Sequence, residues 1–109
     1  MSTRFELVTD DHGRVSFSLV DSDGDVLLQG LPCRGKIAAQ TEVMHTRDSL
    51  RGPDQLIPHE DESGNHFVVL KDDEGSVLGR SRHVAEAELR GLVDQICTAG
   101  PGAAIIDYT

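Results

Sequence analysis

The sequence predicts an α+β fold made of two tandem copies of one β3-α-β unit, and three observations lead to this prediction. The segment 15–27 returns as the segment 66–78, with Gly24 and Gly75 separated by 51 residues (75 − 24 = 51). In each copy, strand-type alternation is followed by helix-type periodicity. A copy of about 50 residues is near the lower limit for folding alone. We therefore expect the 109 residues to form a single domain of two repeats, 1–54 and 55–109, around a shared core.

The first copy opens with three predicted antiparallel strands over 4–9, 14–20 and 25–29. A period of two places every second side chain on the same face of a strand. The segment 14–20 accordingly collects three apolar side chains on one face, and these are Val15, Phe17 and Leu19. The connections 10–13 and 21–24 are rich in Asp and Gly, which suit tight turns.

A helix is expected after the break at 30–32. One of its faces carries a stripe at i, i+4, i+8 and i+11 that would pack on the sheet, formed by Cys33, Ile37, Thr41 and Met44. The helix is expected to end near Ser49. A strand over 56–60 follows and should serve both copies, closing the first and opening the second. Pro58 would confine that strand to an edge or a bulge.

The second copy repeats the order, with strands over 66–70 and 77–79 joined by a turn at 72–75. Ser81 is a candidate N-cap for its helix. The apolar face of that helix is predicted to be Ala85, Leu89, Val93 and Ile96, with Leu92 beside them. This stripe lies 52 residues after the first (85 − 33 = 52), a drift of one residue between strand and helix that an insertion or deletion in a loop would cause. A strand over 104–108 ends the order.

The segment 63–79 resembles the YegP-like family of small bacterial and archaeal proteins, which consist of one or two repeats of about 50 residues. The helix after it and the ending 104–109 are similar as well. This resemblance implies two β3-α-β repeats sharing a single antiparallel sheet, with two helices packed on it and the C-terminal strands exchanged between repeats. Copy one departs from the family at Val20 and Asp21, where Leu and Lys are usual. The family carries no established activity, so the resemblance implies no site residue.

The chain is acidic, with a formal net charge of −9 and a pI of about 4.8. A polyanion is repelled by nucleic-acid phosphates and by acidic membranes, so we expect neither as a partner. No apolar run is long enough for a membrane span, and the first residues lack the apolar stretch of a signal peptide. We expect a cytoplasmic protein that is a monomer, as an internal pseudo-dimer, or a weak homodimer.

The segment 59–66 concentrates side chains that bind metals. His59 and Asp61 would share one face of a strand, and His66 follows nearby. These three are the candidate metal ligands, because imidazole and carboxylate suit several divalent ions. A solvated loop between the repeats is the simpler interpretation. Outside this segment, the sequence indicates no bound cofactor.

Cys33 precedes Arg34 and Lys36 near the expected start of a helix, a setting that would lower the pKa of a thiol. It also lies on the expected apolar stripe of that helix. Together with the lack of a nearby histidine, this favours a structural cysteine, and Cys97 is interpreted in the same way. The sequence carries no catalytic motif such as a nucleophile elbow or a phosphate-binding loop.

Two functional hypotheses remain open. The first is a non-enzymatic binding module that engages a protein partner through an exposed sheet face or strand edge. The second is a small-molecule or metal-binding protein, or a weak enzyme, that uses the region from His59 to His66. The second hypothesis requires a concave pocket with converging polar groups. A core of Val, Leu and Ala around one sheet leaves little room for such a pocket, so we favour the first.

Overall fold

The computed structural model describes residues 2–109 and confirms the predicted α+β class, with one seven-stranded sheet and two α-helices. The elements follow in the order β1 (Arg4–Thr9), β2 (Val15–Val20), β3 (Val26–Gly30), α1 (Lys36–Ser49), the 3-10 helix η1 (Pro53–Gln55), β4 (Leu56–Glu60), β5 (His66–Lys71), β6 (Val77–Ser81), α2 (Glu86–Ala99) and β7 (Ala104–Asp107).

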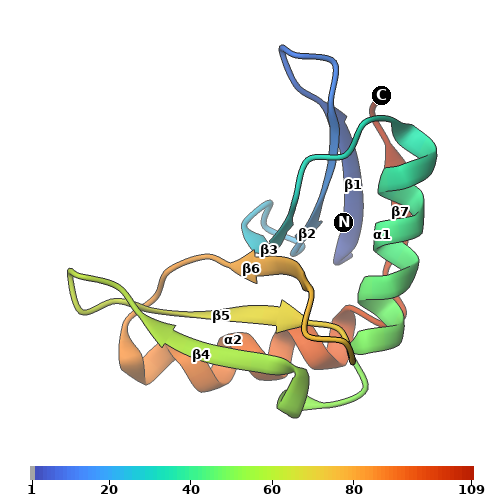
Figure 1. Ribbon diagram of the computed structural model, residues 1–109. Helices are drawn as coiled ribbons and strands as arrows, with labels where there is room; N and C mark the ends of the chain where they lie inside the picture. Colours follow the sequence, from blue (N-terminus) through green and yellow to red (C-terminus); the bar gives the residue numbers. More distant parts are fainter. Residues whose placement is uncertain (1) are drawn as a thin grey trace.

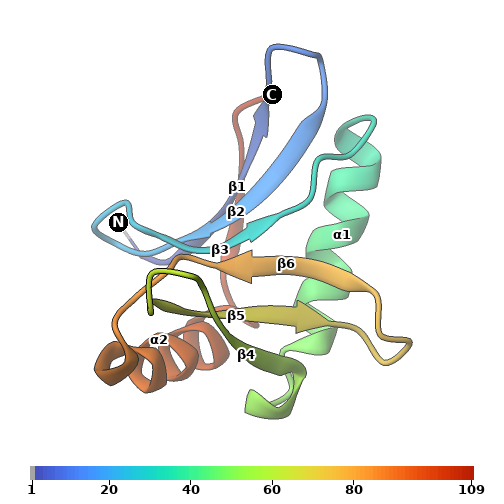
Figure 2. The ribbon, with the colours of Figure 1, turned by 60° about the vertical axis from the view of Figure 1, so that its left-hand side comes forward.

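The sheet has the order β4-β5-β6-β3-β2-β1-β7. We call β1–β3 the first half-sheet and β4–β6 the second half-sheet. In Figure 1 the strands of the first run upright and those of the second run across, and Figure 2 shows the same crossing from another side. The sheet is mixed and not purely antiparallel, because β7 pairs in parallel with β1. Its last strand therefore lies on the first half-sheet, as the expected exchange requires.

The two half-sheets repeat the same turn chemistry at a spacing of 51 residues. Each of the four hairpin turns has a glycine with φ between 79° and 90°, and these are Gly13, Gly24, Gly64 and Gly75 (64 − 13 = 75 − 24 = 51). Glycine is favoured there because a Cβ crowds the left-handed region. In each turn an aspartate carboxylate accepts two backbone N–H groups, as Asp61 does from Ser63 and Asn65. The same bonds at Asp10, Asp21 and Asp72 place matching residues at equivalent positions.

The half-sheets join where β3 pairs with β6 through only three residue pairs. Gly79 is required at this join, since a Cβ would lie 2.6 Å from the carbonyl oxygen of Gln29. Gly30 is equally constrained, because a Cβ there would collide with the ring of Phe17. This close approach makes one continuous sheet, whose apolar face supplies most of the core. The fully buried large side chains include Phe5, Leu7, Phe17, Leu19, Leu27, Leu28, Leu70 and Ile96.

The predicted inner stripe of α1 is wrong. Ile37 is 80% exposed and Met44 50% exposed, and Thr41 is also exposed. The buried face is instead Ala39, Val43 and Thr46, which have the same helical spacing but smaller side chains. The helix begins at Lys36, three residues later than the stripe assumed, and Cys33 pairs with Val15 in an isolated bridge outside it.

The expectations for α2 hold in part. Leu92 and Ile96 are buried, Leu89 and Val93 are half-buried, and Ala85 is exposed as the N-cap. Ser81 is not an N-cap, because it ends β6, where its buried hydroxyl accepts the N–H of Val68. The two helices begin at Lys36 and Glu86, a spacing of 50 (86 − 36 = 50). The helix starts are therefore one residue closer together than the turn glycines, which are 51 apart, so a one-residue difference between strand and helix is present.

The expectation that β4 closes the first copy is also wrong, because β4 pairs only with β5. The other edge, at β1, is closed by β7, which lies beside α1 (Figure 1). Lys36 forms an ion pair with Asp107 at 2.5 Å. The guanidinium of Arg47 donates to the carbonyl oxygen of Ala103 and lies 5.4 Å from the centre of the Phe5 ring. Side chains at both ends of α1 thus hold β7 in place.

The difference in burial along α2 gives a prediction for stability. Ile96→Ala should lower the free energy of unfolding by about 2–5 kcal/mol, because it leaves a cavity in the shared core. Leu89→Ala should cost only about 1–2 kcal/mol, because half-burial halves the area returned to water. Urea unfolding of both variants measures the difference. Equal losses of unfolding free energy in the two variants would contradict the half-buried position of Leu89.

Candidate functional site

The three candidate metal ligands lie on the β4–β5 hairpin but do not converge. His59 stands opposite Phe67 and His66 stands opposite Glu60 in the pairing of β4 with β5. Because successive side chains of a strand point to opposite faces, His59 and His66 lie on different faces of the sheet. Asp61 begins the hairpin turn, and its carboxylate bonds to His83 and to the backbone N–H of Ser63. Across residues 2–109, no group of three or more His, Cys, Asp or Glu side chains could hold a metal ion.

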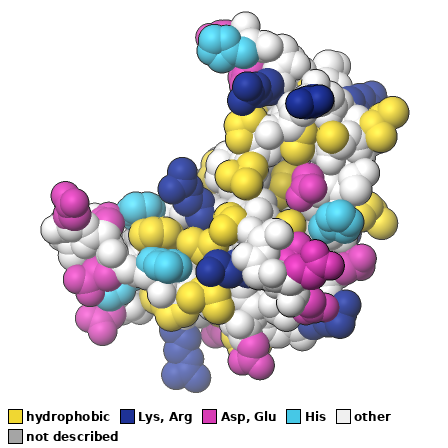
Figure 3. Space-filling view, in the orientation of Figure 1, with side chains coloured by type: hydrophobic (Ala, Val, Ile, Leu, Met, Phe, Trp, Pro, Cys, Tyr) yellow, Lys and Arg dark blue, Asp and Glu magenta, His cyan; other side chains and the backbone are white. Residues whose placement is uncertain are grey.

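The structure assembles a different cluster on the face of the sheet away from the helices, which we call the outer face. The ring of Phe67 stacks on His83 at 4.4 Å between centroids and on His59 at 5.4 Å. His83 also contacts Asp61, with 2.6 Å between Nδ1 and the carboxylate. Asp61, His59, Phe67 and His83 thus form one ladder across the second half-sheet. Figure 3 shows histidine side chains beside hydrophobic ones on this arm of the molecule.

Sequence reasoning missed Phe67 and His83 because their contacts cross between strands. His83 lies 22 residues from Asp61 and is brought to it by the β5–β6 hairpin. A signal for Phe67 was nevertheless present. Its equivalent 51 residues earlier is Ser16, so an aromatic side chain replaces a hydroxyl at the same outward position.

Hydrogen bonds hold the pKa of Asp61 below its ordinary value of 3.8. The largest cause is the bond with His83, followed among the favourable causes by the backbone N–H groups of Asn65 and Ser63. The carboxylate is therefore ionised at neutral pH and acts as an acceptor that orients the His83 ring. This arrangement fixes a side chain and supplies no general acid at neutral pH.

The outer face differs between the two half-sheets. In the first it carries polar side chains, with the hydroxyl of Ser18 2.7 Å from Oε1 of Gln29. The equivalent positions in the second half-sheet are Val69 and Arg80. A hollow of about 430 Å³ opens there, lined by Leu31, His59, Phe67, Val69, Val77, Gly79 and Arg80. The second half-sheet therefore presents an apolar surface where the first presents a polar one.

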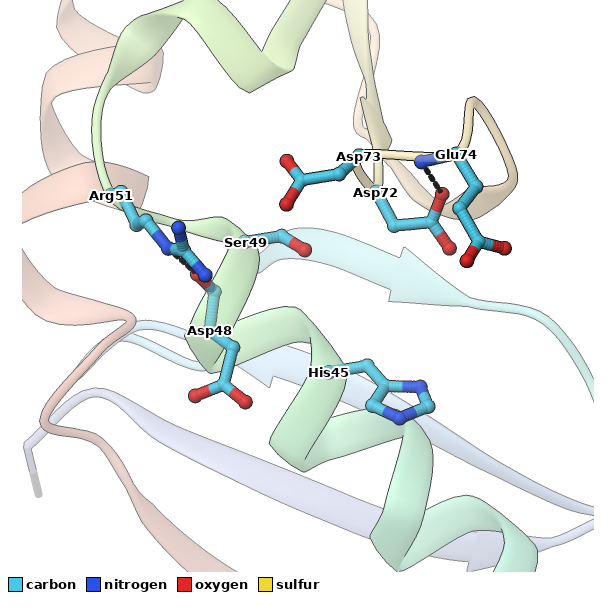
Figure 4. A pocket seen from close by; sticks show the side chains of 7 residues that line it. All are labelled: His45, Asp48, Ser49, Arg51, Asp72, Asp73 and Glu74. Carbon is cyan, nitrogen blue, oxygen red and sulfur yellow. Dashed lines mark hydrogen bonds between the residues drawn. The ribbon is translucent and has the colours of Figure 1, made fainter.

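A second hollow, of about 280 Å³, lies between the end of α1 and the β5–β6 turn and is mostly acidic. Figure 4 shows that the carboxylates of Asp48, Asp73 and Glu74 point in different directions. Asp72 accepts the N–H groups of Glu74 and Ser76 and so belongs to the turn. Arg51 donates to the carbonyl oxygen of Asp48. These side chains stabilise the local backbone and do not form a convergent site.

Neither cysteine is activated as a nucleophile. Burial raises the pKa of the Cys33 thiol, and the nearby Glu42 carboxylate raises it further. Burial and Asp94 raise the pKa of the Cys97 thiol in the same way. The structural interpretation of both residues is consistent with these shifts, because a reactive cysteine requires a lowered pKa.

A third surface lies where β4, the last strand of the second half-sheet, meets α2. A groove of about 480 Å³ runs between them, lined by Pro53, Leu56, Pro58, Val68, Glu86, Leu89, Arg90, Val93 and Asp94. Its floor is apolar and its rim is charged. We call this surface the edge groove. At the opposite end of the sheet, the equivalent space beside β1 and α1 is filled by β7.

The fold closely matches two solved solution structures. One is the yegP protein of unknown function from Escherichia coli, which is 18% identical, with a TM-score of 0.90 over 100% of this chain and 95% of that chain. The other is the UPF0339 protein SO3888 from Shewanella oneidensis, which is 19% identical, with a TM-score of 0.90 over 100% of this chain and 93% of that chain. The predicted resemblance to YegP-like proteins is thus confirmed in the fold. No family model and no curated protein matches the chain.

No helix within residues 2–109 is long and apolar enough to cross a membrane.

The contact between Asp61 and His83 gives a prediction on pH. Because the pKa of Asp61 is lowered on folding, its bonds stabilise the fold above its ordinary pKa of 3.8, and this contribution is lost as the pH falls through the folded value. His83→Ala should raise the pKa of Asp61 towards 3.8. Carboxyl ¹³C NMR against pH measures this shift, and His59→Ala is the control that should leave it unchanged. A pKa of Asp61 that is the same in the His83 variant would contradict the assignment.

Proposed function

We propose that this chain is a non-enzymatic protein-interaction module that binds an extended segment of a partner by adding it as a strand to the outer edge of β4. One observation carries the proposal. The sheet has two equivalent outer strands, and β7 covers β1, whereas no strand within residues 2–109 covers β4. The edge of β4 therefore presents outward carbonyl groups and the N–H of Glu60 next to an apolar groove.

The hydrogen-bonding directions along β4 follow from those along β1. Tyr108 donates its N–H to the carbonyl oxygen of Leu7, so the backbone of Leu7 points away from β2 and towards β7. The equivalent of Leu7 is Pro58 (7 + 51 = 58), and alternate residues point the same way. Leu56 and Glu60 consequently face the open edge. The N–H of Leu56 already donates to the carbonyl oxygen of Pro53 in η1, whereas the N–H of Glu60 faces the open edge of β4. Ile57 and His59 direct theirs to β5.

Pro58 is compatible with a strand edge that binds a specific partner. It lacks the N–H that would otherwise point outward, so an added strand would make one fewer hydrogen bond there than β7 makes with Leu7. Natural sheets use proline on edge strands to limit uncontrolled pairing between copies. Affinity at this edge must then come also from side chains in the groove, where Leu89 and Val93 stand half-buried.

Peptides that bind this chain, selected from a displayed library, should protect the outward amide of Glu60 at the edge of β4. We expect hydrogen exchange at Glu60 to slow when a selected peptide is bound, because its N–H gains an acceptor. Exchange at Leu56 should change less, because its N–H already donates to the carbonyl oxygen of Pro53. Exchange at Ile57 and His59 should change little, since those groups already face β5. Residue-resolved exchange by NMR makes this comparison.

Two matched variants test whether the groove takes part. Val93→Glu places a charge in the groove and should weaken the selected peptides at least tenfold. Gln95→Glu adds the same charge to an exposed position of the same helix and should leave binding unchanged. Both variants should first be shown to be folded by thermal melting. Peptides whose affinity is unchanged by Val93→Glu, and which slow hydrogen exchange at other amides, would contradict the proposal.

A small-molecule site on the outer face is the second candidate function, and the ladder around Phe67 favours it. An apolar hollow next to stacked rings and the exposed guanidinium of Arg80 has the composition of a site for a planar anion, such as an aromatic carboxylate. This candidate retains His59 from the second sequence hypothesis. It does not require His66, whose side chain lies on the other face of the sheet.

Amide NMR shifts distinguish the two candidates. Titration with benzoate and with larger aromatic carboxylates should give saturable shifts at Phe67, Val69 and Arg80 if the outer face is a ligand site. Arg80→Gln should then weaken binding, while leaving the fold intact because Arg80 is exposed. A spectrum that stays unchanged at millimolar ligand would exclude this class of ligand.

A further inference from the structure

The occupied edge of the sheet shows what a strand at this position needs. In β7, the side chains of Ile105 and Asp107 point to the helix side, since they alternate with the outward Ile106. Ile105 packs against the core beneath α1. Asp107 forms its ion pair with Lys36, the first residue of α1, and this bond is the largest cause of a lowered pKa of Asp107, at about 2. An apolar residue and a charged residue two positions later thus fit the groove beside α1.

The open edge has the same architecture with the opposite charge. Helices α1 and α2 are both 14 residues long and occupy equivalent places, so Lys36 corresponds to Glu86. Val43 likewise corresponds to Val93 and Ala39 to Leu89 (93 − 43 = 89 − 39 = 50). The two α1 residues are buried, whereas their α2 counterparts are half-buried and line the edge groove. Within residues 2–109, no strand covers Leu89 and Val93 as β7 covers the α1 side, and Glu86 forms no ion pair like that of Lys36.

We propose that the partner segment adds parallel to β4, with an apolar residue over Leu89 and Val93 and a Lys or Arg two positions later beside Glu86. This inference rests on the proposed function and specifies the chemistry of the partner. The apolar residue occupies the place that Ile105 has at the other edge, and the basic residue occupies the place of Asp107. Asp94 adds a second carboxylate to the rim. Glu86, Asp94 and Arg90 together carry one net negative charge.

Charge also argues against a second copy of this chain as the occupant. Its own closing strand would bring Asp107 next to Glu86, and two chains of net charge −9 repel each other. A basic segment is attracted by the same field. The partner class is therefore an extended basic-apolar segment of another protein, and the chain's own C-terminal strand with one charge reversed is a suitable probe for it.

The experiment uses two synthetic peptides with the sequence of residues 102–109, one native and one carrying Asp107→Lys. Each is titrated into the ¹⁵N-labelled full chain, and dissociation constants are taken from the amide shifts of Leu56 and Glu60. The Lys peptide should bind about twofold to fivefold more tightly than the Asp peptide, as expected for one partly exposed ion pair. The preference should weaken as salt is added.

Two variants with the same change in net charge provide the control. Glu86→Lys should reverse the preference, so that the Asp peptide binds more tightly. Glu88→Lys should keep the preference for the Lys peptide, because Glu88 is exposed and does not line the groove. Pro58→Val should tighten both peptides alike, since it restores an outward N–H to the edge of β4.

The possible results separate the inference from the proposed function. Equal affinities of the two peptides at Leu56 and Glu60 would overturn the requirement for a basic residue and leave strand addition in place. No shift at these amides with millimolar peptide would overturn both. Shifts confined to Phe5 and Leu7 would mean exchange with β7 and would also overturn both. Shifts of Leu56 and Glu60 on concentrating the protein alone would make a second copy the occupant.

Discussion

Backbone hydrogen bonding at the two ends of the sheet is the constraint on which the architecture depends. Each half-sheet has an inner strand and an outer strand, and the pairing of β3 with β6 satisfies the inner edges. The outer edges, at β1 and β4, still need partners or protection. The described chain supplies one further strand, β7, and places it at β1. Within residues 2–109, an open edge at β4 therefore follows from two outer strands, β1 and β4, and a single further strand that covers β1.

The central join explains why the outer face could diverge between the halves. Gly30 and Gly79 allow β3 and β6 to meet closely, so both helices can cover the same face of one sheet. Packing against these helices constrains the inner side chains, and the hydrophobic residues of β2 and β5 alternate accordingly. The outer positions carry no such constraint. Ser16 and Ser18 can occupy them in one half, and Phe67 and Val69 in the other.

The sequence predicted the strands well because a half-buried strand has a period of two that few other structures share. It also predicted the turns, since Asp and Gly have specific roles in them. The face of α1 was not predictable in this way. Two stripes with helical spacing compete there, and the larger side chains of Ile37 and Met44 favoured the wrong one. The face with the smaller side chains, such as Ala39, packs on the sheet because the helix lies close to it. Only the tertiary packing determines the distance between the helix and the sheet.

The candidate sites were less predictable than the fold, for a physical reason. His59, Asp61 and His66 are close in sequence, but the alternation of strand faces separates the two histidines. The groups that do meet, such as the stacked rings of Phe67 and His83, come from different segments of the chain. No local sequence pattern predicts which of these segments lie side by side. The open edge is visible only when equivalent positions are compared in three dimensions. Sequence repetition identifies those positions, and the structure shows which one is filled.

The charge at the first residue of α1 also favours one register of the strand beside it. A strand that slips by one residue turns its apolar side chain to the opposite face. Backbone hydrogen bonds alone discriminate poorly against such a slip, because every register offers similar donors and acceptors. At β7, the Lys36–Asp107 pair adds a second fixed point two residues beyond Ile105. Glu86 can do the same at β4 for a segment of opposite charge, and the two edges then discriminate between their strands by the sign of one residue.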